Sequence, residues 1–103
     1  MDLGISIKKL AMLSFHESLK LDAPDPQFSP IVKSLWYDAK GDWEQAHAQV
    51  DQLNDLDSAW VHAYLHRKEG DIWNADYWYA RAKKTRPNGS LDDEWAQLVE
   101  ALV

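Results

Sequence analysis

The chain has 103 residues, a net charge of −6, 46% apolar and 27% charged residues, and no cysteine. This apolar content in so short a chain predicts one α-helical domain over residues 1–103 and excludes extensive disorder. The negative charge argues against nucleic acid as the main partner, because phosphates would be repelled. No apolar run approaches the roughly 18 residues of a membrane helix, and without cysteine neither disulfides nor thiol chemistry are available.

The N-terminal part of the chain, residues 1–21, lacks the basic and apolar regions of a secretory signal, so we expect a cytoplasmic protein. A helix is expected over Ile5–Leu19, where apolar residues recur at helical spacing. Pro24 and Pro26 follow it. Because proline has no backbone N–H and restricts the residue before it, residues 22–28 are predicted to be a stiff connector.

Four helices are expected over residues 29–87, where glycine and proline fall between segments of helical periodicity. Ser29 and Asp42 are predicted to cap the first two, and Gly41 separates them. Asp57 or Ser58 is expected to open the third, Gly70 to end it, and Asp71 to cap the fourth. The expected bounds after the first helix are Trp43 to about Leu53, Ala59 to Lys68, and Ile72 to about Lys84.

The C-terminal part, residues 88–103, is predicted to form a last amphipathic helix. Ser90 and Asp93 have the spacing of a capping box with the shorter acid. A continuous apolar stripe follows at helical spacing. Its members are Leu91, Trp95, Leu98, Val99 and Leu102.

One block of the sequence occurs twice. Lys40–Ala46 returns 29 residues later as Glu69–Ala75, with glycine, aspartate and alanine in the same places. In each copy glycine can end one helix, aspartate can cap the next, and the small alanine lets the two helices approach closely. The block therefore predicts two helical hairpins that pack side by side.

The second copy resembles the second half of a tetratricopeptide repeat (TPR), a family of helical hairpins. The residues that carry the likeness are Gly70, Ala75, Tyr79, Ala82 and Pro87. The resemblance covers about residues 28–87, and residues 91–103 are similar to the helix that closes such arrays. It implies an all-α fold of two TPR-like hairpins between an N-terminal helix and a C-terminal capping helix. It also implies a non-enzymatic module that binds a protein or peptide.

The segment from His66 to Ala82 is also similar to a block found in uncharacterised bacterial proteins, to which no activity is attached. In the family, peptide-binding grooves are lined by the first helix of each hairpin. The resemblance places Trp60, Tyr64 and Arg67 in such a groove. We expect a binding surface there.

Four large rings crowd the expected helix over Ile72–Lys84. Tyr79 shares a stripe with Ile72, Ala75 and Ala82 and is predicted to be buried. Trp73 and Tyr77 lie together on another face, and Trp78 shares an edge with Arg81. Two interpretations stay open. The rings fill the seams between helices, or they form a surface for a partner or for self-association.

Polar side chains beside these rings are His62, His66, Glu69, Asp71, Asn74 and Arg81. His62 and His66 lie one turn apart and could share a metal ion if His47, Asp76 or Glu69 supplied a third ligand. The simpler interpretation is a structural cluster in which Asp71 caps a helix and the histidines bond within a seam. We therefore predict no metal or other cofactor.

A small metal-dependent or acid–base enzyme, or a small-ligand binder, is the alternative function.

Overall fold

The computed structural model describes residues 6–103. Over this range the protein is all-helical, which confirms the predicted fold class. None of the described helices is both long and apolar enough to cross a membrane. The helices are α1 (Ile7–Ser18), α2 (Pro30–Ala39), α3 (Trp43–Val50), α4 (Leu56–Glu69), α5 (Ile72–Arg81) and α6 (Leu91–Leu102).

Most helix starts lie where the sequence predicted them. The side chains of Ser29, Asp42, Asp71 and Ser90 each accept a hydrogen bond from the backbone N–H three residues later. Such a bond satisfies one of the N–H groups that the first turn of a helix leaves without a partner. For α1 the cap is Ser6, and the first residue of the expected helix, Ile5, lies outside the described residues.

Three predicted boundaries were wrong by three residues each. Helix α4 begins before Asp57, because the side chain of Asp55 caps it by accepting from the N–H of Ser58. Helix α5 ends at Arg81, because Lys83 takes a left-handed conformation with φ of 60° and the next N–H turns back to Tyr79. Helix α3 ends at Val50, not near Leu53.

The turns that join α2 to α3 and α4 to α5 share the same hydrogen bonds. Gly41 and Gly70 have φ of 82° and 89°, a region where glycine carries no steric cost. The next N–H, of Asp42 or Asp71, turns back to the carbonyl of Tyr37 or His66, five residues earlier. This pattern ends the first helix and starts the second within three residues between α2 and α3 and within two between α4 and α5.

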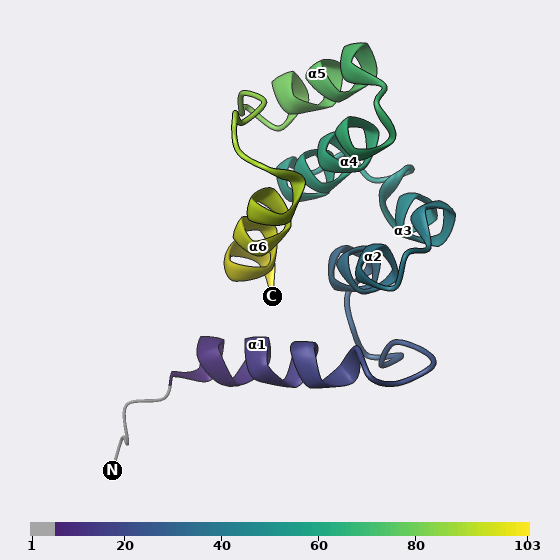
Figure 1. The fold of residues 1–103 in the computed structure, drawn as a ribbon, viewed down its shortest axis with the longest axis vertical. Helices are drawn as coiled ribbons and strands as arrows, with labels where there is room; N and C mark the ends of the chain where they lie inside the picture. Colours follow the sequence, from purple (N-terminus) through teal and green to yellow (C-terminus); the bar gives the residue numbers. More distant parts are fainter. Residues whose placement is uncertain (1–5) are drawn as a thin grey trace.

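The helices form a short stack with α1 across one end (Figure 1). Helix α2 packs on α3 and α4 packs on α5, while α6 lies against α2 and α4. The main core joins α1, α2, α3, α4 and α6, and a smaller one joins α4 to α5. Buried residues of the main core include Phe15, Leu35, Trp36, Val50, Tyr64, Leu65 and Leu98.

Helix α1 is attached to the rest by one buried ring and by polar contacts at its end. Phe15 is buried beside Phe28 and Trp95. The indole Nε1 of Trp36 donates to the carbonyl of Ser18, and Lys40 Nζ donates to two carbonyls just after the helix. These bonds satisfy carbonyls that the end of a helix leaves without an intrahelical partner.

Candidate functional site

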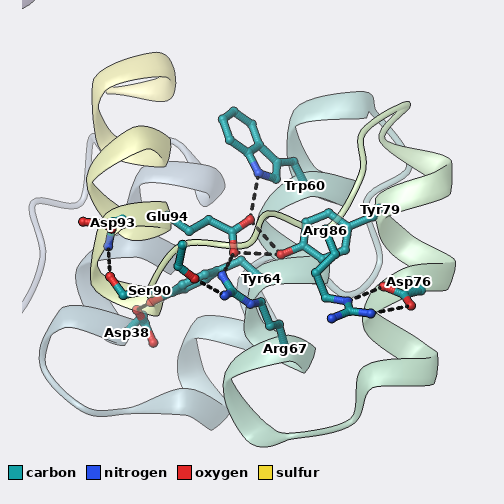
Figure 2. A network of polar contacts seen from close by, with 11 residues as sticks. Asp38, Trp60, Tyr64, Arg67, Asp76, Tyr79, Arg86, Ser90, Asp93 and Glu94 are labelled. Atoms are coloured by element: carbon teal, nitrogen blue, oxygen red, sulfur yellow. Dashed lines mark hydrogen bonds and ion pairs between the residues drawn. The ribbon is translucent and has the colours of Figure 1, made fainter.

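The groove expected along α4 is covered by α6. The carboxylate of Glu94, which is 1% exposed, accepts from Trp60 Nε1 at 3.3 Å and from Arg67 Nη1 at 2.9 Å (Figure 2). The hydroxyl of Tyr79 donates to the same carboxylate at 2.7 Å. Arg67 also donates to the carbonyl of Gly89, just before α6. Trp60 and Arg67 therefore hold α6 against α4 and α5.

Tyr64, the third residue of the expected groove, is buried. Its hydroxyl donates to a carboxylate oxygen of Asp38 at 2.7 Å, and Lys68 Nζ donates to the other oxygen at 2.8 Å. Asp38 is itself buried on α2, so this contact ties α2 to α4. Of the three residues expected to line a groove, Tyr64 therefore has almost no exposed surface, and the polar atoms of all three have partners inside the protein.

The outer face of α5 carries exposed rings. The side chain of Trp73 is 78% exposed and that of Tyr77 is 46% exposed, and the two rings stack at 6.3 Å. The guanidinium of Arg81 lies 5.8 Å from the ring centre of Tyr77 and 5.2 Å from that of Trp78. Tyr79 points the other way and is buried, as its spacing predicted. We call Trp73, Tyr77 and Arg81 the aromatic surface.

The polar cluster named from the sequence divides into separate parts. Asp71 caps α5, and the amide of Asn74 donates to its side chain. His66 Nδ1 lies 2.7 Å from Glu69 Oε2, and one oxygen or nitrogen of each of His66, Glu69 and Asp71 falls within 4.8 Å of the others. Arg81 lies with the rings instead. The capping role of Asp71 is confirmed.

A second group of titratable side chains joins α3 to α4. His47 on α3 contacts His62 on α4 through their Nε2 atoms, which are 3.0 Å apart. One ring nitrogen from each of His47, His62 and His66 lies within 4.8 Å of the others. Trp43 stacks on His47 at 4.8 Å, and Trp78 stacks on His62 at 4.0 Å. We call His47, His62 and His66 the histidine cluster.

Burial favours the uncharged form of two of these rings, His47 and His62. Loss of water around His62, with His47 and His66 as neighbours, lowers the pKa of His62 to about 3. Burial and then the His66 ring lower the pKa of His47, while Asp51 and Glu69 act in the opposite direction. His47 and His62 therefore carry neutral imidazoles at neutral pH, the form that binds metal ions.

Glu94 was not among the residues predicted from the sequence to form a site, although its position on the last helix is unusual for an acid. Glu94 lies three residues after Leu91 and four before Leu98, on the apolar stripe of the last helix. An acid on the buried face of a helix needs a partner inside the protein. Its partners come from α4 and α5, so only the folded chain reveals them.

Comparison with known proteins gives no match of any kind: no protein-family model, no curated protein and no solved structure matches this chain.

Proposed function

We propose that this protein is a non-enzymatic interaction module in which α2–α3 and α4–α5 are two TPR-like hairpins between α1 and a capping α6. The support is a local pattern of residues that occurs in both pairs of helices. Gly41 and Gly70 end one helix in the same conformation, Asp42 and Asp71 cap the next, and the alanines four residues on are fully buried. Small buried residues at these points allow the paired helices to approach closely.

We propose the aromatic surface as the binding site. The observation that carries this is the exposure of Trp73, which stacks on Tyr77 yet leaves most of its indole in water. Tryptophan, tyrosine and arginine are the residue types that most often dominate the energy of protein interfaces. A rigid pair of rings on a helix also loses little conformational entropy when a partner covers it.

The charge around this surface favours a partner with acidic side chains. Residues 72–86 contain four basic residues and one acid, Asp76, which pairs with Arg86 at 2.8 Å. Opposite charge accelerates association and selects among partners. The occupant we propose is a segment of another protein that presents apolar side chains between aspartates or glutamates.

Selection of peptides on the intact protein tests this. Random 12-residue peptides displayed on phage would be selected on the wild type, and their affinities measured by fluorescence anisotropy. We expect enrichment of apolar and acidic residues, and at least tenfold weaker binding to Trp73→Ala/Tyr77→Ala. The matched control, Leu10→Ala/Leu21→Ala, removes exposed apolar side chains from α1 and its end and should bind as the wild type does.

Two results would count against the proposal. Selected peptides that bind the Trp73→Ala/Tyr77→Ala variant equally well would place the site elsewhere. A dimer in analytical ultracentrifugation that this variant alone abolishes would show that the aromatic surface serves a second copy of the chain, and not a separate partner.

A further inference from the structure

The histidine cluster brings three imidazoles together from two helices. The ring centres of His47 and His62 are 4.7 Å apart, those of His62 and His66 4.8 Å, and those of His47 and His66 5.2 Å. His62 and His66 lie one turn apart on α4, and the turn between α3 and α4 places His47 opposite them. Three imidazoles, each with a ring nitrogen within 4.8 Å of the others, are a donor set for a transition metal.

The shortest contact in the cluster shows what an ion would replace. The Nε2 atoms of His47 and His62 are 3.0 Å apart, so one of these two nitrogens carries a proton and donates it to the lone pair of the other. Three nitrogens around a tetrahedral zinc ion, each about 2 Å from it, are about 3.3 Å apart. An ion bound between the rings would use both Nε2 lone pairs after a small rotation of the side chains, and the ring that carries its proton on Nε2 would carry it on Nδ1 instead.

A carboxylate orients one of the three rings, and a second carboxylate lies near another. Glu69 Oε2 accepts from His66 Nδ1 at 2.7 Å, which leaves Nε2 of His66 as the nitrogen available to a ligand. Asp51 Oδ2 lies 3.9 Å from Nδ1 of His47, on the side away from His62. Carboxylates on the far nitrogen are the usual supports of metal-binding histidines. In His62, Nε2 is the nitrogen that faces His47, and Nδ1 is buried without a hydrogen-bond partner.

We propose that His47, His62 and His66 bind a zinc ion through three imidazole nitrogens, with Glu69 as the positioning residue for His66. Three histidines leave the fourth tetrahedral position to water or to an external ligand. His47 is partly exposed and gives the ion a route from solvent. Trp43 stacks on His47 and Trp78 stacks on His62, so these two rings flank the site. Because its ligands come from α3 and α4, the ion would cross-link the two pairs of helices.

Zinc titration of the full chain without an affinity tag tests the site. After treatment with a chelator, calorimetric titration with zinc chloride should show one equivalent bound per chain, and zinc should raise the unfolding temperature. Long-range ¹H–¹⁵N spectra of the wild type should show ring nitrogens of three histidines shifting together, while His16 on α1 stays unchanged.

Two variants and one control separate the site from adventitious binding. His47→Gln removes the most exposed ligand and should weaken zinc binding at least tenfold, and Glu69→Gln should weaken it roughly 10- to 100-fold. His16→Gln removes an exposed histidine and should bind as the wild type does. Failure of the wild type to bind zinc, or binding that His47→Gln leaves unchanged, would overturn the proposal. Either result would leave the peptide-binding proposal untouched.

Discussion

The hydroxyl of Tyr79 on α5 lies 2.7 Å from both carboxylate oxygens of Glu94 on α6. The same carboxylate accepts from Arg67 and Trp60 on α4, so one buried acid connects three helices. A buried carboxylate is tolerated only when its charge is paired and its oxygens are hydrogen-bonded. Glu94 meets both conditions and links α6 to α4 and α5.

Replacing Glu94 with glutamine should destabilise the protein by about 3 kcal/mol, because the guanidinium of Arg67 loses its counter-charge inside the protein. Urea unfolding followed by circular dichroism measures the change. Glu100→Gln on the exposed side of α6 is the control and should stay within about 0.5 kcal/mol of the wild type. Equal unfolding midpoints for Glu94→Gln and the wild type would show that the ion pair contributes nothing.

Stability should fall in alkaline solution because of two buried tyrosines. Burial raises the pKa of Tyr64 and of Tyr79 above the ordinary value of 10.0, and the carboxylates of Asp38 and Glu94 raise them further. Above about pH 10 the unfolded chain ionises at these positions and the folded chain does not, so the free energy of unfolding decreases as the pH rises.

Urea unfolding at several pH values between about 9 and 11 measures this slope. Tyr79→Phe should make it shallower, whereas Tyr77→Phe, at a half-exposed ring, should leave it as in the wild type. An unchanged slope in Tyr79→Phe would mean that this hydroxyl does not contribute to alkaline unfolding.

Two tryptophans should differ sharply in their contribution to stability. Trp36 is 2% exposed in the main core, and Trp36→Ala should cost about 3–5 kcal/mol through lost burial and the cavity left behind. Trp73→Ala removes a ring that is largely in water and should change stability by no more than about 0.5 kcal/mol. Thermal unfolding compares them, and a strongly destabilised Trp73→Ala would make Trp73 a structural residue.

Asp55 should matter more than its neighbour Asp57, although both are acids at the start of α4. Asp55→Ala removes the cap on the N–H of Ser58 and should cost about 1 kcal/mol. Asp57→Ala loses only a favourable interaction with the helix dipole, a few tenths of a kcal/mol. Chemical denaturation measures the free energy of unfolding of both variants. Equal losses would assign the effect to charge and not to capping.

Helix starts could be predicted because a cap acts on residues only three positions away. Asp42 and Asp71 each follow a glycine and precede a helical pattern, and both cap as expected. Near α4 the sequence offers Asp55, Asp57 and Ser58 within four residues, so local signals could not choose among them. The end of α5 was missed because it depends on a lysine with positive φ, a conformation that lysine rarely adopts.

Most contacts within the candidate sites could be identified only in the folded structure. Helical spacing separated exposed Trp73 from buried Tyr79, because both lie on one short helix. The same reasoning could not show that α6 covers Trp60 and Arg67, since their partner Glu94 is about 30 residues away along the chain. The sequence left His47 as one of three candidates for a third ligand beside His62 and His66. Only the packing of α3 on α4 shows that His47 lies next to both.

The two glycine turns have a consequence for chemical synthesis of the protein. At φ of 82° and 89°, Gly41 and Gly70 occupy the backbone region that amino acids of the opposite chirality prefer, and both are exposed. A D-alanine at either position would keep the native turn and restrict the unfolded chain, a gain of roughly 0.4–1 kcal/mol. These turns are thus places where a mirror-image residue suits the fold better than any natural side chain.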